Sequence, residues 1–203
     1  SGLNYGDTLG NPSYTLGAFQ TGVGQNVTVT YTYSGTTAAG THYGPTTTKP
    51  TAAGSYTVTV NYEDTLNVGS GSADFTILKK AITATVVAVS RSYGDANPTF
   101  TYTVLPGAVV GTDNIGLILS STATAASPVG TYNVTGTASN TNYTVTVDGA
   151  NKLTVTARGI TVTADAKTRE YGNANPSFTY TLTAGTIYGS DNIGLVLATT
   201  ATA

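Results

Sequence analysis

Few residues of this 203-residue chain could carry out catalysis. Its only histidine is His42 and its only glutamates are Glu63 and Glu170, while cysteine, methionine and tryptophan are absent. Hydrolysis by paired carboxylates needs two acids held a set distance apart, and the two glutamates occupy unrelated positions of the repeat described below. The lack of cysteine excludes a thiol nucleophile, a disulfide framework and a Cys-ligated metal site. The sequence therefore predicts no catalytic, cofactor-binding or metal-binding residues, and a protein that is not an enzyme.

Acidic and amide side chains leave one alternative open, a structural calcium ion. Asp95 with Asn97, and Asp113 with Asn114, offer the oxygen ligands that calcium prefers. Each repeat has few carboxylates, however, and a calcium site needs several that converge. We therefore expect no cofactor and keep calcium as the alternative. A covalent isopeptide bond to an asparagine is a second alternative, with the lysine supplied by Lys79, Lys80 or Lys152.

Composition narrows the class of protein further. Charged residues make up only 9% of the chain and the formal net charge is −2. That charge argues against a nucleic-acid partner, which requires a basic surface to neutralise phosphates. No run of about 18 apolar residues exists, so we expect no insertion into a membrane. The sequence has neither an initiator methionine nor a signal peptide, and we expect a mature or excised piece.

Comparison of the chain with itself shows an internal repeat. Residues 93–102 recur with small changes at residues 171–180, an offset of 171 − 93 = 78, and residues 113–117 recur at 191–195 with the same offset. A divergent copy at the start contains Tyr5-Gly6-Asp7 followed by an Asn-Pro pair. Several blocks in one register exclude coincidence, and the chain is therefore a tandem array.

The repeat defines three predicted domains. Residues 1–79 form a divergent repeat that lacks its first strand, residues 80–158 a complete repeat, and residues 159–203 a repeat that lacks its C-terminal part. Because the missing parts at the two ends are unequal, we expect a fragment of a longer array.

The elements that position these residues are predicted to be short strands. Apolar and polar residues alternate in many segments, which is typical of a sheet with one buried face. We expect an all-β fold of tandem small antiparallel β-sandwich or β-grasp-like domains in an elongated string. A short helix or turn is expected at residues 112–118, with Asp113 as the cap, and again at 190–195. The predicted core of the complete repeat consists of Tyr102, Ile115, Leu117, Tyr132, Val134, Val145, Val147, Leu153 and Val155.

The repeated Tyr-Gly signature has two interpretations. Tyr5, Tyr93 and Tyr171 could form exposed aromatic platforms for sugars. Alternatively, the glycine adopts an unusual backbone angle at a bend and the tyrosine packs beside it. We favour the structural interpretation, because a feature present in every repeat usually serves folding.

Residues 93–100, 130–135 and 142–156 resemble the YGX-type MBG repeats of bacterial surface adhesins, including filamentous-haemagglutinin-like exoproteins. The shared pattern is a strand ending in Tyr-Gly, then Asn-Pro, a Gly-Thr-Tyr strand, an Asn-Tyr-Thr strand and a closing Leu-Thr-Val strand. The resemblance implies an extracellular location at a bacterial cell surface and a stalk region that projects a binding region and supports adhesion or biofilm. It brings no catalytic residues.

The expected partners are the neighbouring repeats of the same chain. Two alternative functions are left open. One is a module that binds surface glycans or host proteins, for which the loop at residues 41–50 is the best place. The other is a subunit that self-associates into fibres through unpaired strand edges.

Overall fold

The structure, a computed structural model, describes residues 2–15 and 26–202. All regular structure in these ranges is β-strand, which confirms the all-β prediction. No helix in the described part of the chain is long and apolar enough to cross a membrane. Part of the predicted first domain, 1–79, lies outside the described residues, as do Ser1 and Ala203.

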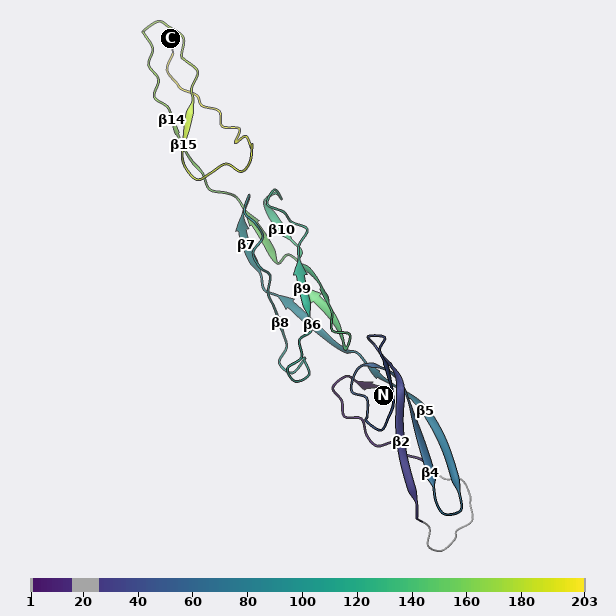
Figure 1. The fold of residues 1–203 in the computed structure, drawn as a ribbon. Coiled ribbons are helices and arrows are strands. Elements are labelled where there is room, and N and C mark those ends of the chain that lie inside the picture. Colours follow the sequence, from purple (N-terminus) through teal and green to yellow (C-terminus); the bar gives the residue numbers. More distant parts are fainter. Residues whose placement is uncertain (1, 16–25, 203) are drawn as a thin grey trace. The chain divides into compact units, whose positions relative to one another are not determined.

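The described residues of the N-terminal segment, 2–15 and 26–79, form one sheet of five strands in the order β1-β5-β4-β2-β3. The strands are β1 (Leu3–Asn4), β2 (Thr28–Thr37), β3 (His42–Thr46), β4 (Gly54–Glu63) and β5 (Val68–Leu78). The long strands β2, β4 and β5 lie side by side in antiparallel pairs (Figure 1). Their alternating Thr, Val and Tyr residues suit this arrangement, because β-branched and aromatic side chains pack well on a pleated surface.

Aromatic side chains form the core of this sheet. Tyr33 and Tyr56 are 2% and 3% exposed. The ring of Phe75 stacks on Tyr56 at 5.6 Å and meets the edge of Tyr33 at 6.4 Å. The hydroxyl of Tyr56 donates to the carbonyl of Ala52 at 2.9 Å, so the polar end of this buried ring has a partner. In this chain, which has no Trp or Met, tyrosine thus supplies large side chains for the core.

The second repeat, residues 80–158, contains eight short strands. They are β6 (Lys80–Val86), β7 (Val89–Ser92), β8 (Tyr102–Val104), β9 (Leu117–Ser120), β10 (Gly130–Tyr132), β11 (Thr135–Ala138), β12 (Tyr143–Asp148) and β13 (Leu153–Thr156). The sheets have the orders β12-β6-β8, β10-β13-β7 and β11-β9.

Strand direction differs in part from the antiparallel prediction. Strands β1–β5, β12–β6 and β13–β7 pair in parallel. Alternation of apolar residues reports which face of a strand is buried and says nothing about the direction of its neighbour. The parallel pairs join the beginning of the second repeat to its end, so that β6 and β7 are held by the closing strands β12 and β13.

The third repeat, residues 159–203, contributes the antiparallel pair β14 (Thr161–Ala164) and β15 (Tyr180–Ala184). In the described residues 157–202 no side chain is buried. Strand β14 corresponds to part of β6, which has a neighbour on each side, whereas β14 pairs with β15 alone in its two-stranded sheet. One edge of β14 therefore has no partner strand among the described residues.

The chain divides into two compact units. Unit 1 contains residues 1–85, 102–119 and 136–148, and unit 2 contains residues 86–101, 120–135 and 149–203. Each unit therefore includes strands from two of the predicted repeats. The boundaries at 79/80 and 158/159 come from the sequence repeat and stay predictions.

Of the short helix or turn predicted at 112–118 and at 190–195, the helix is wrong and the turn is confirmed. Residues 113–116 are irregular and β9 begins at Leu117. Gly116 has a φ of 62° and its N–H donates to Oδ1 of Asn114 at 2.8 Å. The same bond joins Gly194 and Asn192 at 2.8 Å. These side-chain turns compete with helix formation, which explains why the cap signal misled.

The predicted core is confirmed at four positions. Ile115, Val134, Leu153 and Val155 are each 3% exposed or less. The remaining five predicted core residues, Tyr102, Leu117, Tyr132, Val145 and Val147, are half-buried. The strands are short and their sheets small, so most strands of this repeat bury at most two side chains, and β6 buries three.

Candidate functional site

The Tyr-Gly signature forms the same tight turn in all three copies. The φ angles of Gly6, Gly94 and Gly172 are 92°, 89° and 88°, a region that residues with a Cβ avoid. In each copy, the residue after the glycine donates its N–H to the carbonyl three residues before it. The predicted bend is therefore confirmed.

Tyr5 and Gly6 contact the loop that precedes β9, and we call this set of contacts the first junction. The hydroxyl of Tyr5 donates to Oδ2 of Asp113 at 2.7 Å. Tyr143 donates to the same carboxylate oxygen at 2.8 Å and accepts from the N–H of Val110 at 2.9 Å. The rings of Tyr5 and Tyr143 meet edge to face with centroids 5.4 Å apart. The first junction thus links residues more than 100 positions apart within unit 1.

Packing supports these polar contacts. Val110 lies directly against Gly6, where an added Cβ would come within 2.6 Å of Val110 Cγ2. Tyr5 and Val110 also pack on a cluster formed by buried Ile82, Ile115 and Tyr143. Two features therefore require glycine at this position, the positive φ angle and the close contact with Val110.

The shared carboxylate shifts the ionisation of its partners. The hydrogen bond to Asp113, together with burial and the nearby negative charge, raises the pKa of Tyr5 to about 12. Hydrogen bonds from Tyr5 and then Tyr143 lower the pKa of Asp113 below its ordinary 3.8. Because the pKa of Tyr5 is raised, its contribution to stability is fully present below about pH 10 and is lost as pH rises to about 12.

Asp113→Asn is expected to return the pKa of Tyr5 from about 12 toward 10, because the acceptor charge is removed. The measurement is an NMR titration of tyrosine Cζ, with Tyr5→Phe used to assign the signal.

Asp191→Asn is the matched control, because Asp191 is the equivalent of Asp113 in the next repeat (191 − 113 = 78) and its replacement should leave the pKa of Tyr5 unchanged. Titration of Tyr5 near pH 10 in the unsubstituted chain would mean that the hydrogen bond does not persist in solution.

Tyr93 and Gly94 make similar contacts with Tyr188 and Asp191, and we call this set of contacts the second junction. The rings of Tyr93 and Tyr188 meet edge to face at 5.3 Å. A hydrogen bond to Asp191 raises the pKa of Tyr93. Tyr188 lies where Val110 lies in the first junction, since the two positions differ by the repeat offset of 188 − 110 = 78.

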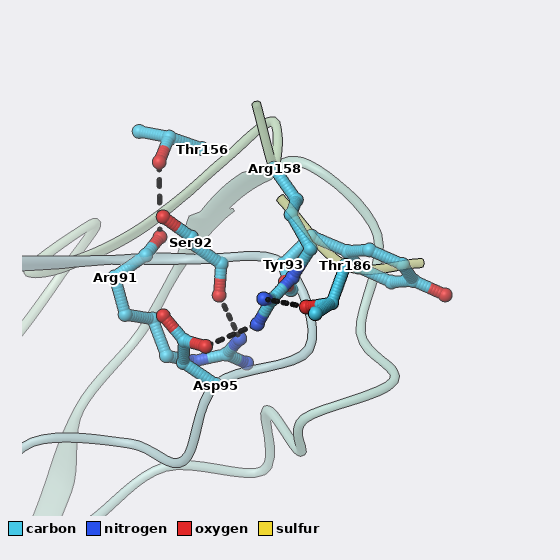
Figure 2. A network of polar contacts seen from close by, with 7 residues as sticks. All are labelled: Arg91, Ser92, Tyr93, Asp95, Thr156, Arg158 and Thr186. Carbon is cyan, nitrogen blue, oxygen red and sulfur yellow. Dashed lines mark hydrogen bonds and ion pairs between the residues drawn. The ribbon is translucent and has the colours of Figure 1, made fainter. Parts of the chain in front are cut away.

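Arg158 adds contacts that the first junction lacks. Its Nε donates to the carbonyl of Tyr93 at 2.7 Å and its Nη1 donates to Oγ1 of Thr186 at 3.0 Å. The same guanidinium pairs with Asp95, as Figure 2 shows. Half of the Asp95 side chain is exposed, so this ion pair contributes little to stability.

Beside the second junction lies a cleft of about 200 Å³. Its lining is mainly apolar and includes Val129, Ile160, Tyr188 and Ile193.

A buried arginine forms hydrogen bonds within the second repeat. Arg91 is only 7% exposed. Its Nε donates to Oδ1 of Asn97 at 2.8 Å, and its Nη atoms donate to the carbonyls of Ser92 and Thr124. Asn97 in turn donates to the carbonyl of Ala123 at 2.6 Å. We call these hydrogen bonds of Arg91 and Asn97 the latch. The asparagine of the Asn-Pro motif therefore takes part in the latch as well as in a turn.

Parts of the latch recur in the other copies. In the third repeat, Arg169 donates to Thr202 O and Asn175 donates to Ala201 O. In the N-terminal segment, Lys49 donates to Oδ1 of Asn11 at 2.8 Å. A cation that donates to the asparagine of the Asn-Pro motif is thus present in the first and second copies, and the asparagine-to-carbonyl bond is present in the second and third.

The oxygens considered for calcium face protein donors instead. Asp95 pairs with Arg158, Asn97 with Arg91, and Asp113 with two tyrosines. The described residues contain no group of three or more His, Asp or Glu side chains that could hold a metal ion.

The few residues considered for catalysis lie on different elements. His42 is exposed at the start of β3, Glu63 is exposed at the end of β4, and Glu170 is exposed beside the third Tyr-Gly turn. The lysine considered for an isopeptide bond at position 80 directs its Nζ toward the carbonyl of Gly107 at 3.5 Å.

The family is shown by a comparison with known domain families. The sequence profile of the MBG domain (YGX type) matches residues 82–154 and 160–203, which together exceed half of the chain. The chain belongs to this family, whose members are structural repeat domains of surface-associated proteins. No curated protein and no solved structure matches the chain.

Proposed function

We propose that this chain is a spacer region of an extracellular bacterial surface protein. It projects a binding region away from the cell and so supports adhesion or biofilm formation. It acts through the stiffness of its repeats and catalyses no reaction. Its partners in this role are the neighbouring repeats of the same polypeptide.

The observation that carries the proposal is the recurrence of one contact at both junctions. Each time, the aspartate of the facing loop raises the pKa of the tyrosine of a Tyr-Gly turn, and a side chain packs on the glycine. Repeats joined only by flexible linkers would not require such contacts. Repeats that must transmit force or keep a direction would benefit from them.

Small-angle scattering of the chain tests the proposal. A compact globule of this length has a radius of gyration of about 17 Å. A spacer is expected to give a clearly larger value that stays constant between dilute and concentrated samples. A value near 17 Å would contradict the proposal. Labelling of intact cells with an antibody to the chain tests the surface location.

Self-association into fibres is a second candidate, favoured by the unpaired edge of β14. In the second repeat the equivalent strand β6 pairs with β12 on one side and β8 on the other. An open edge presents backbone donors and acceptors that a strand of another chain could pair with. Light scattering over a concentration series tests this candidate, and a strict monomer would count against it.

Binding of a surface glycan or a host protein stays a proposal for residues 41–50. This segment includes β3 and its hairpin with β2. The sugar-platform interpretation of Tyr5 and Tyr93 is less attractive, because both rings contact other tyrosines. A glycan array probed with the whole chain tests sugar binding.

A further inference from the structure

The third Tyr-Gly turn has the geometry of the other two and none of their junction contacts. The φ of Gly172 is 88°, against 92° and 89° for Gly6 and Gly94. Tyr171 is 99% exposed, and a Cβ added at Gly172 would meet no atom within 4 Å. The three turns thus have the same backbone. Other residues of the chain cover the tyrosine and the glycine in the first two turns, and no described residue covers them in the third.

We propose that the turn Tyr171-Gly172-Asn173 is a docking surface for the Asp-Asn-Ile loop of a further MBG repeat joined in the same polypeptide. This inference rests on the junction contacts, and it holds whether or not the chain acts as a spacer.

The two junctions define what the partner loop must contain. It needs an aspartate to accept a hydrogen bond from the Tyr171 hydroxyl, as Asp113 does from Tyr5. Three residues before that aspartate it needs a side chain that packs on the glycine, as Val110 and Tyr188 do. The aspartate should follow Tyr171 by 98 residues, the separation 191 − 93 found at the second junction.

A second copy of this chain does not offer such a loop. Asp113 already accepts a hydrogen bond from Tyr5 of its own chain, and Asp191 already faces Tyr93, whose pKa it raises. Residues 1–79 contain no Asp-Asn-Ile sequence. A further repeat in cis meets both requirements, and it pays less entropy for association than a separate molecule does.

One difference between the second and third turns must be tolerated. Asn173 stands where the second turn has Asp95, which pairs with Arg158. The first junction forms without an arginine contact of this kind, through Tyr5, Asp113 and Tyr143 alone. Asparagine at this position is therefore compatible with docking.

The test extends the chain by repeating residues 126–203 once after Ala203, which places a copy of Asp191 at the required spacing. Nitration of tyrosines by tetranitromethane, read by peptide mass spectrometry, reports their accessibility. Tyr171 is expected to react readily in the 203-residue chain and at least about tenfold more slowly in the extended chain. Replacing the added copy of the aspartate by alanine should restore the fast reaction.

Tyr93 serves as the internal control, because it is covered in both chains and should stay protected. The inference is overturned if Tyr171 of the extended chain reacts as fast as in the shorter chain while Tyr93 is protected. It is also overturned if Tyr171 of the 203-residue chain becomes protected as its concentration rises, since a second copy would then be the partner.

A single substitution tests the turn without any extension. Asp95→Asn gives the second turn the sequence Tyr-Gly-Asn-Ala-Asn-Pro of the third turn. Tyr93 of this variant is expected to keep its slow nitration within about a factor of two, as for other losses of a weak surface ion pair. A rise to the rate of Tyr171 would show that this turn sequence cannot dock, which would refute the inference.

Discussion

Arg91→Met is expected to lower the free energy of unfolding of the second repeat by about 2–3 kcal/mol. Methionine keeps an unbranched apolar stem but cannot donate to Asn97 Oδ1 or to the carbonyls of Ser92 and Thr124. These acceptors lie around a side chain that is only 7% exposed, so water replaces the lost donors poorly. Asn97 would also lose the contact that holds it toward Ala123.

Native-state hydrogen exchange is the suitable measurement, because an array of repeats need not unfold in one step. The amides of Val89 and Tyr93 bond to the carbonyls of Lys152 and Thr156 and report on the pairing of β7 with β13. Their protection should fall by about 30- to 150-fold.

Arg169→Met is the matched control for Arg91→Met. Arg169 occupies the same repeat position and donates to two carbonyls, of which Thr202 is the equivalent of Thr124, but it is only half-buried. Its replacement should cost less than about 1 kcal/mol, because water can reach the acceptors. Equal losses in the two variants would mean that burial does not set the strength of the latch.

The sequence predicted the repeat and the backbone of its main motif. Identical spacing of the Tyr-Gly and Asn-Pro pairs in the second and third copies located the turns, and glycine after tyrosine indicated the positive φ that Gly94 and Gly172 adopt. Alternation of Thr with Val and Tyr located the strands of the N-terminal sheet, including β2 and β4. These features are local, so a few neighbouring residues determine them.

The junction contacts could not be predicted in the same way. The contact between Tyr93 and Tyr188 joins two turns that are far apart in sequence. Neither turn has a sequence pattern that indicates which segment it contacts. In the sequence, Asp113 resembled a helix cap. The structure shows instead that its carboxylate accepts hydrogen bonds from Tyr5 and Tyr143. The signature interpreted as the folding element of one repeat therefore also joins that repeat to the next one.

The buried arginine was missed for a different reason. Charged residues are seldom fully buried, so Arg91 carried no expectation of a structural role. A signal was nevertheless present, because Arg91 and Arg169 differ by the repeat offset of 169 − 91 = 78 in a chain with few charged residues. The recurrence of a rare residue type at one repeat position indicates a role that every copy needs.

Gly94→Ala is expected to destabilise the second junction by about 2–4 kcal/mol, through two separable causes. The backbone at φ 89° costs a residue with a Cβ about 1 kcal/mol. The new Cβ would also lie 2.7 Å from Cδ2 and 3.0 Å from Cβ of Tyr188. Because the near atoms include the root of that side chain, rotation cannot relieve the clash, and overpacking of this kind costs about 1–3 kcal/mol.

Gly172→Ala separates the two causes of this loss. The φ of Gly172 is 88°, so the backbone cost is the same, but no atom lies within 4 Å of the added Cβ. This variant should lose only about 1 kcal/mol in urea unfolding, and the nitration rate of Tyr93 should stay unchanged. In Gly94→Ala the displaced Tyr188 should expose Tyr93, whose nitration rate should rise. Equal losses in the two variants, with Tyr93 protected in both, would mean that the glycine serves the turn alone and that the close packing at the second junction does not exist in solution.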